Sequence, residues 1–390
     1  VIPQRIQRRA VACFVLRYRR QTSTSTLDER YMESPMNFAP DRAFYRPRVL
    51  LALVVLVGAG YGLGLAESGP ERLSDGRVVG PDDPQKGCIK CHDGEVRAWE
   101  GTTHFEAYEE LDGSEKAEEI LENLGFDDYA VEVAKCQTCH VTMYAEDEGD
   151  ELEGKWGISC ESCHGPASDW VDIHQDYGKT AEGVKITPEE RAKETAEHRL
   201  ARIASSVAAG MIRPENLYDL ASNCMGCHSV PDPELVDVGG HTAGSVGFEL
   251  VAWSQGHVRH NFLHGGKNEA AKPERLHLLY VIGKVVDLEF GLRGLSKATD
   301  DGAYKEAMMA RVSSALEAIS AVKSALGDAH SEVLAVIMAA GNEKTEAAAD
   351  KVRDAGKALA ESLGDGSGLA GISELLPDPS TYVVEKRSGR

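Results

Sequence analysis

The sequence predicts a mainly α-helical protein with little regular sheet, and three observations support this fold class. In residues 272–364 the apolar residues recur near the spacing of helix turns, as on one face of an amphipathic helix. Residues 93–111 also have a helical pattern, and four copies of a short cysteine motif each fit one helical turn. We therefore expect a compact helical domain followed by a C-terminal helical hairpin or bundle.

Length and charge narrow the classes of partner. A chain of 390 residues has room for two or three domains. It contains 42 Lys and Arg against 63 Asp and Glu, a net charge of −21. Because an acidic surface repels phosphate backbones, nucleic acid is excluded as a partner. Basic proteins, cations and small neutral substrates remain compatible with this charge.

The N-terminal part combines basic charge with an apolar run. Residues 1–66 contain ten arginines, no lysine and four acidic residues, so the rest of the chain has a net charge of −27. Residues 49–66 are uncharged, follow three arginines and end in the small residues Gly64 and Ala66. This pattern predicts a signal peptide, with a signal anchor in the membrane as the alternative. In both cases the body is exported. Residues 1–35 read as a doubtful extension outside the fold.

The cysteines carry the clearest chemical signal. Eight of the nine form four copies of C-x-x-C-H, the attachment pattern of c-type haem. Two thiols three positions apart on one turn can form thioethers to one haem, and the following histidine binds the iron. The predicted attachment cysteines are Cys88, Cys91, Cys136, Cys139, Cys160, Cys163, Cys224 and Cys227, with His92, His140, His164 and His228 as the proximal iron ligands.

Disulfides and zinc are the alternative uses of these cysteines. Disulfides suit an exported chain, but they give no reason for a histidine after every second cysteine. Two zinc sites of four thiolates each would also leave those four histidines unexplained. The sequence therefore predicts four covalently bound haem c groups, in a compact multihaem cytochrome domain that spans residues 87–265.

Other histidines are candidates for the distal iron positions. His104 follows His92 by twelve residues, which on a continuous helix is about 18 Å, too far for one iron. We therefore expect His104 to bind a haem attached elsewhere, the fourth in particular, because the segment before Cys224 has no histidine. His174, ten residues after His164, is predicted to be a distal ligand by the same argument.

Residues 240–265 contain four more histidines, among which the sequence does not decide. We favour His260 and His241, with His257 as the rival. His198, His277 and His330 lie in charged or helix-packing surroundings and are not expected to bind iron.

The surroundings of the motifs resemble the tetrahaem cytochrome c-554 family. Residues 86–104 (KGCIKCHDGEVRAWEGTTH), 135–140 (KCQTCH) and 157–174 (GISCESCHGPASDWVDIH) carry this resemblance, which covers roughly residues 85–230. It implies a mostly α-helical exported electron carrier of the kind known from hydroxylamine oxidation, with haems in close pairs.

The resemblance also bears on the iron ligands. In the family, the residues in the places of His104 and His174 are axial ligands to haems other than the one bound just before them. One haem in the family is five-coordinate, so the resemblance leaves open whether all four irons are closed here. The segment LYDLASN (217–223) lacks the histidine that the family would have there, and the last 120 residues have no counterpart.

Two flanking segments and a helical region complete the organisation. Residues 67–86 are rich in Gly, Pro and Asp and are predicted to be a linker. Residues 272–364 are predicted to form helices at 272–295, from Asp300 and Asp301 to Gly327, at 329–340 and at 343–363, with Asp300 and Asp301 as candidate caps of the second. Residues 365–390 are predicted to be a flexible tail.

These features favour an electron carrier over an enzyme. The predicted function is an exported tetrahaem c-type cytochrome, periplasmic or otherwise extracytoplasmic, that transfers electrons between redox partner proteins in nitrogen-compound respiration. Those partners are expected to be basic or membrane-bound. One alternative is an oxidoreductase acting on a nitrogen oxide or hydroxylamine at an open haem iron. Another is a haem subunit of a membrane redox complex.

Overall fold

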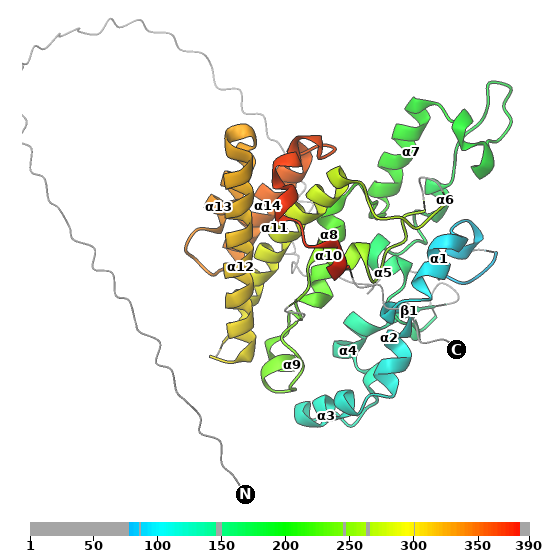
Figure 1. Cartoon of the computed structure of the whole chain (residues 1–390). Coiled ribbons are helices and arrows are strands. Elements are labelled where there is room, and N and C mark those ends of the chain that lie inside the picture. The colour runs from blue at the N-terminus through cyan, green and yellow to red at the C-terminus, as the bar shows by residue number, and fades with distance from the viewer. Residues whose placement is uncertain are drawn as a thin grey trace, which may run out of the picture. The chain divides into compact units, whose positions relative to one another are not determined.

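The computed structural model describes residues 78–85, 87–145, 150–244, 247–262, 266–299 and 301–382 (Figure 1). Within these ranges the chain is largely helical, with one pair of short strands, and the predicted mainly α fold class is confirmed. None of the helices in these ranges combines the length and apolar character that crossing a bilayer requires. The predicted signal segment at 49–66 and the extension before it lie outside the described residues.

The first half of the described chain consists of short helices around one β-hairpin. The strands β1 (Thr142–Tyr144) and β2 (Glu153–Trp156) pair in antiparallel fashion. The helices of this half are α1 (Asp93–Trp99), α2 (Thr103–Asp112), α3 (Glu115–Leu124), α4 (Ala134–His140), α5 (Cys160–His164) and α6 (Val171–His174), with 3₁₀ turns at Cys88–Lys90 and Ala130–Glu132.

The helical pattern of residues 93–111 corresponds to two helices rather than one. The hydroxyl of Thr102 donates to the carbonyl of Trp99 at 2.7 Å and accepts the backbone N–H of Phe105 at 3.3 Å. Thr102 therefore closes α1 and caps α2 with one side chain. The premise of a continuous helix between His92 and His104 is thus incorrect, and only the histidine positions described below bear on their pairing.

The middle of the chain links the hairpin region to the long C-terminal helices. Its elements are a 3₁₀ turn at Pro188–Lys193 and the helices α7 (Ala196–Ala208), α8 (Leu217–His228), α9 (Pro233–Asp237) and α10 (Leu250–Gln255). Helix α8 packs against the following long helix, α11, so the middle and the end of the chain are in direct contact.

The C-terminal region contains four helices close to the predicted ranges. They are α11 (Pro273–Lys297), α12 (Ala303–Leu326), α13 (Ser331–Ala340) and α14 (Glu346–Ser362), followed by 3₁₀ turns at Ser367–Leu375 and Pro379–Thr381. The predicted cap of α12 is replaced by a more distant residue. Gly302 stands at the N-cap position, and the carboxylate of Asp237 accepts the N–H of Tyr304 at 3.0 Å. Asp301 instead pairs with Lys305 at 2.8 Å.

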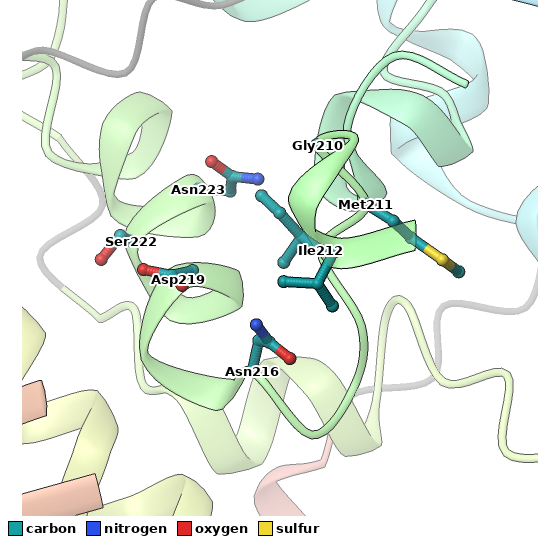
Figure 2. A pocket seen from close by; sticks show the side chains of 8 residues that line it. Gly210, Met211, Ile212, Asn216, Asp219, Ser222 and Asn223 are labelled. Atoms are coloured by element: carbon teal, nitrogen blue, oxygen red, sulfur yellow. The ribbon is translucent and has the colours of Figure 1, made fainter. Parts of the chain in front are cut away.

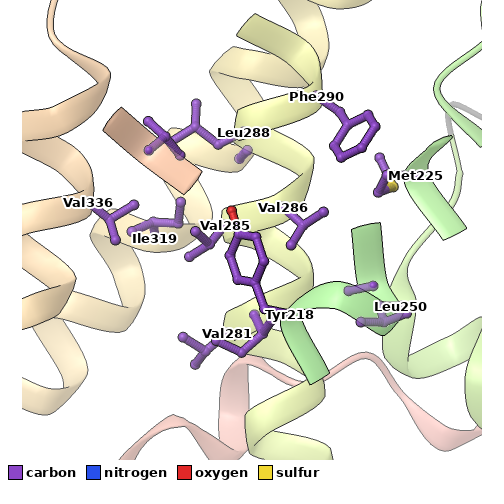
Figure 3. Close-up of a cluster of buried hydrophobic side chains, with 14 of the residues drawn as sticks. Tyr218, Met225, Leu250, Val281, Val285, Val286, Leu288, Phe290, Ile319 and Val336 are labelled. Carbon is purple, nitrogen blue, oxygen red and sulfur yellow. The ribbon is translucent and has the colours of Figure 1, made fainter. Parts of the chain in front are cut away.

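One apolar core runs through α8, α10 and the C-terminal helices. Tyr218 and Met225 of α8 and Leu250 of α10 are buried against α11, where Val285 and Val286 are fully buried (Figure 3). The hydroxyl of Tyr218 also donates to the Glu289 carboxylate at 2.7 Å. The C-terminal helices therefore share their core with α8, the helix that carries the fourth cysteine motif.

Two segments predicted to be irregular contribute to the packing instead. In the predicted tail, residues 367–375 form a 3₁₀ helix in which Leu369 and Ile372 are fully buried against the C-terminal core. In the predicted linker, Val78 is buried and the N–H groups of Val79 and Gly80 donate to Glu161 at 3.0 and 2.8 Å. Both segments are short and rich in Gly, which made them look irregular, although their apolar residues have partners in the fold.

Candidate functional site

Each C-x-x-C-H motif occupies a helical turn. The second motif completes α4, the third is α5 itself, and the fourth completes α8. The first motif begins with a 3₁₀ turn, and its histidine, His92, is the N-cap of α1. In all four motifs the two cysteines and the histidine are thus close together, as attachment to a single group requires.

The cysteines are available for attachment. None of the eight described cysteines forms a disulfide, and all are half-buried except Cys91, which is exposed. In the described ranges, no group of three or more His, Cys, Asp or Glu side chains is arranged to hold a metal ion. A hydrogen bond joins the thiols of Cys88 and Cys160, so the first and third motifs are in contact. This hydrogen bond and burial raise the pKa of Cys160.

Further contacts join the third, fourth and second motifs. The amide of Asn223, one residue before the fourth motif, donates to the carbonyl of Cys163 at 2.9 Å. On the other side, the Cys227 sulfur lies 3.9 Å from the carbonyl oxygens of Thr138 and Cys139 in the second motif. The four motifs therefore form one contiguous row in the order first, third, fourth, second.

Three of the four motif histidines lie beside the ring of a second histidine. The ring centroids are 6.1 Å apart for His104 and His228 and 6.5 Å apart for His140 and His241. For His164 and His260 the separation is 6.2 Å.

His92 and His174 are the remaining two histidines. Burial lowers the pKa of His174, and the charge that His92 carries when protonated lowers it further. Burial and the same charge also lower the pKa of His164, and Nδ1 of His92 lies 3.6 Å from the Glu95 carboxylate. His104, His241 and His260 thus each lie beside a motif histidine from a different part of the sequence, whereas the pairing of His174 with His92 stays a prediction.

Backbone carbonyls orient several of these rings. The Nδ1 atoms of His174, His241 and His260 lie 2.6, 2.8 and 2.6 Å from the carbonyl oxygens of Val171, Thr242 and Val258. In the same way, Nδ1 of His164 lies 2.8 Å from the carbonyl of Ile212. An imidazole that donates from Nδ1 to a carbonyl keeps its Nε2 lone pair for a metal, and such partners are typical of metal-bound histidine.

The residues present fit haem c. Imidazole nitrogens bind metals at about 2 Å, so two imidazoles on opposite faces of one iron have ring centres roughly 6 Å apart. The three measured separations, 6.1, 6.2 and 6.5 Å, match that spacing. In each case one member of the pair directly follows two thiols on a helical turn, where thioethers to the porphyrin would form.

Aromatic side chains surround the fourth motif histidine. Phe248 stacks on the His228 ring at 4.5 Å, and Trp253 meets the same ring edge-on at 5.2 Å. His257 lies against Trp253 at 4.9 Å and has no ring contact with a motif histidine among the described residues. Of the three rivals in residues 240–265, His241 and His260 therefore lie next to motif histidines, and His257 lies next to an indole.

Glu161 is a structural residue of the site that the sequence reasoning missed. It lies between the two cysteines of the third motif and is 2% exposed. Its carboxylate accepts N–H groups from Val79, Gly80 and Ala167 at 3.0, 2.8 and 2.7 Å. Burial raises its pKa, and these three hydrogen bonds oppose the increase. The signal available in the sequence was a charged residue between the two cysteines of an attachment motif, a position close to the haem.

A cavity of about 310 Å³ lies between the end of α7 and α8 (Figure 2). Met211 and Ile212 border it on one side and Asn216, Asp219 and Asn223 on the other. Because Ile212 and Asn223 also contact the third motif, the cavity belongs to the surroundings of that motif.

The three histidines that were not expected to bind iron have other surroundings. His198 pairs with Glu194 at 2.8 Å through Nδ1. The Nε2 atom of His277 lies 3.0 Å from the hydroxyl of Ser373. The ring of His330 lies beside Gly368, far along the chain from any motif.

Comparison with known proteins agrees with the motif analysis. Residues 87–165 match the family model described as cytochrome c554 and c-prime. The cytochrome c-554 of Nitrosomonas europaea is 30% identical over 142 residues, which are 33% of this chain. The chain spans 60% of the length of that relative, and no solved structure matches it. Residues 87–165 are therefore similar to the cytochrome c554 family, and c-type cytochromes of this kind carry covalently bound haem c.

Proposed function

We propose that this chain is an exported tetrahaem cytochrome that carries electrons between extracytoplasmic redox partners. The observation that carries the proposal is the contiguous row of four C-x-x-C-H motifs, three of which have a second histidine beside their own. Haem c, when bound, supplies one-electron chemistry at its iron. The family match over residues 87–165 supports the same class of protein.

The chain's own residues would attach, orient and shield the groups. The eight motif cysteines would form the thioethers, and the motif histidines with their distal partners would supply the axial nitrogens. Carbonyls such as those of Ile212 and Thr242 fix the ring orientations. Contacts such as that of Asn223 with Cys163 hold neighbouring attachment sites at close range, a requirement for rapid electron exchange.

The charge distribution favours a basic partner. Residues 106–132, which include most of α2 and all of α3, contain eleven acidic residues and one lysine, and ten of the eleven are exposed. Tyr129, within the same segment, is 72% exposed. This segment packs against α4, which carries the second motif. Such a surface would steer a positively charged redox protein toward the second motif at the end of the row.

The enzyme alternative requires an iron with an open position. The presence of a second histidine beside three of the four motif histidines favours the carrier. The membrane-complex alternative depends on residues 49–66, which lie outside the described part of the chain. No contact within the described part favours it.

Mass spectrometry of the purified holoprotein under denaturing conditions tests the proposal. Four haem masses retained on the chain are the expected result, and Cys163→Ser should weaken attachment at the third site alone. A redox titration should then show four one-electron transitions. Retention of no haem, or recovery of two zinc ions per chain, would overturn the proposal.

A further inference from the structure

The indole of Trp170 is a buried hydrogen-bond donor without an acceptor in the described part of the chain. Trp170 lies between the third motif and His174 and is 6% exposed. Its Nε1–H makes no hydrogen bond to another described residue. Because taking such a donor out of water is costly, buried tryptophan N–H groups usually find an acceptor. Trp170 therefore calls for an acceptor that these residues do not provide.

The position of Trp170 is fixed at both ends of its segment. On one side, the N–H of Ala167 donates to the Glu161 carboxylate at 2.7 Å, and the backbone N–H of Trp170 donates to the carbonyl of Ala167 at 3.1 Å. On the other side, the N–H of His174 donates to the carbonyl of Trp170 at 2.9 Å, and the two rings meet edge to face with centroids 5.2 Å apart. Since Glu161 belongs to the third motif, the indole is held between that motif and His174.

The other three tryptophans of the chain donate to acceptors within the protein. Their acceptors are the carbonyl of Ile158 for Trp99, the carboxylate of Asp82 for Trp156 and the carbonyl of Gly247 for Trp253, at 2.8, 3.3 and 3.3 Å. Trp170 is the most buried of the four and the one whose donor has no such partner among the described residues. The difference points to an acceptor outside the polypeptide.

Two more buried donors show the same pattern. Ser229 directly follows His228, and Arg259 directly precedes His260. The Ser229 hydroxyl and the Nε–H of Arg259 are buried and have no partner among the residues that the structure describes. Like the indole, both donors adjoin a histidine that is predicted to bind iron.

Haem c brings a matching acceptor. Most of the edge of the macrocycle is apolar, and its polar groups are a pair of propionate carboxylates that accept hydrogen bonds from N–H groups. An ionised carboxylate that leaves water needs such donors, because burial of an unpartnered charge is costly. A buried donor beside a predicted iron ligand meets this requirement.

We propose that the indole N–H of Trp170 donates to a propionate carboxylate of the haem beside His174 and raises the reduction potential of that haem. The inference rests on the proposed function, since it requires haem at the attachment motifs. It goes further by assigning a residue that binds no iron and forms no thioether. A propionate places negative charge close to the iron and favours the ferric state, and a donor to that carboxylate offsets part of this effect.

Redox titration of the full-length holoprotein tests the assignment. In Trp170→Phe, which removes the N–H and keeps an aromatic ring, one of the four midpoint potentials should fall. At the wild-type midpoint of that haem, the ratio of reduced to oxidised haem should decrease about threefold, or roughly 28 mV for a one-electron couple. The matched control is Trp156→Phe, because the protein itself supplies the acceptor of that indole. The control should keep all four wild-type potentials.

A tryptophan analogue at position 170 isolates the N–H itself. In benzothienylalanine a sulfur atom replaces the N–H, and the shape of the indole is retained. This protein should show the same decrease in potential as Trp170→Phe. It also provides the measurement if Trp170→Phe does not fold.

The remaining outcomes overturn the assignment or the proposed function separately. Unchanged potentials in both altered proteins would mean that the indole N–H bonds a buried water and not a propionate. An equal shift of all four potentials, or a shift in Trp156→Phe as well, would show a general structural effect and overturn the assignment. In both cases four haem masses on the wild-type chain leave the tetrahaem carrier in place. Fewer than four haem masses contradicts the proposed function itself.

Discussion

His104 and His228 face each other with their ring centroids 6.1 Å apart, although His104 begins its helix in the first third of the chain and His228 ends α8. Because the two residues lie 124 positions apart, only the tertiary fold brings them together. The pairing places α2 against the fourth motif, the motif whose preceding segment has no histidine of its own. It links the part of the chain that matches the cytochrome c554 family to the part beyond that match.

The first prediction concerns this pair. His104→Ala should convert the haem of the fourth motif, and no other, to a high-spin form that binds carbon monoxide on reduction. The physical reason is that the variant removes one of two axial imidazoles and leaves His228 in place. Electron paramagnetic resonance combined with a carbon monoxide titration measures the change.

His198→Ala is the control for this prediction, because His198 pairs with Glu194 and lies beside no motif histidine. The control should keep the wild-type spectrum. Loss of the low-spin signal at the first motif instead of the fourth would contradict the pairing of His104 with His228.

Periodic and motif signals predicted much of this molecule. The four C-x-x-C-H motifs are local in sequence, so their spacing alone indicated helical turns and haem attachment. The apolar pattern of residues 272–364 predicted α11 to α14 within a few residues, because α12 to α14 bury one face each and α11 is buried on most sides.

Contacts between distant segments could not be predicted in the same way. The cap of α12 comes from Asp237 of α9, and the nearer Asp301 pairs with a lysine. In the 3₁₀ helix at residues 367–375, Leu369, Ile372 and Leu375 recur every three residues, but so short a segment among Gly and Ser was taken for a tail. Sequence spacing carries no record of such partners.

The second prediction concerns the buried carboxylate of Glu161. Glu161→Ala should lower the free energy of unfolding of the holoprotein by about 3 kcal/mol, because it leaves three buried N–H donors without an acceptor. Denaturant unfolding measures this change. Glu118→Ala, on the exposed side of α3, is the control and should change stability by no more than about 0.5 kcal/mol.

Glu161 also gives stability a pH dependence. Burial raises the pKa of Glu161 above 4.5, the ordinary value of a glutamate side chain. The folded protein therefore binds the proton of this carboxyl group more tightly than the unfolded chain does. Its contribution therefore falls as the pH rises from about 4.5 through the raised pKa. Glu161→Gln, which cannot ionise, should lack that decrease. An identical slope in both proteins would contradict the assignment.

The third prediction concerns Arg202 and Glu194. The guanidinium of Arg202 donates to both oxygens of Glu194 at 2.8 and 2.7 Å and to the carbonyl of His174 at 2.6 Å. The hydrogen bond from Arg202 lowers the pKa of Glu194 to about 2. Its stabilisation is thus fully present above the unfolded pKa, near 4.5, and is lost as the pH falls through about 2.

Arg202→Gln should therefore flatten the acid side of the stability profile, by up to about 3 kcal/mol between the two limits. Unfolding measured from pH 6 down to pH 2 checks this. Lys193→Gln is the control, since its pair with Glu190 is largely exposed and contributes little. A wild-type slope retained in Arg202→Gln would show that the pair does not set the acid stability.

The last prediction concerns the end of the chain. Leu369 is fully buried in the core that α11 shares with α8, and Leu334 of α13 is 44% exposed. Leu369→Ala should lower the free energy of unfolding by about 2–5 kcal/mol, because it removes apolar contacts and leaves a cavity in that core. Leu334→Ala should lower the free energy of unfolding by well under half as much, since nearly half of Leu334 is already exposed to water. The low-spin spectrum of Leu369→Ala should match that of the wild type, because no histidine pair contacts this position among the described residues. Equal stability of the two variants would mean that residues 367–375 do not pack on the core in solution and act as the tail that their sequence suggests.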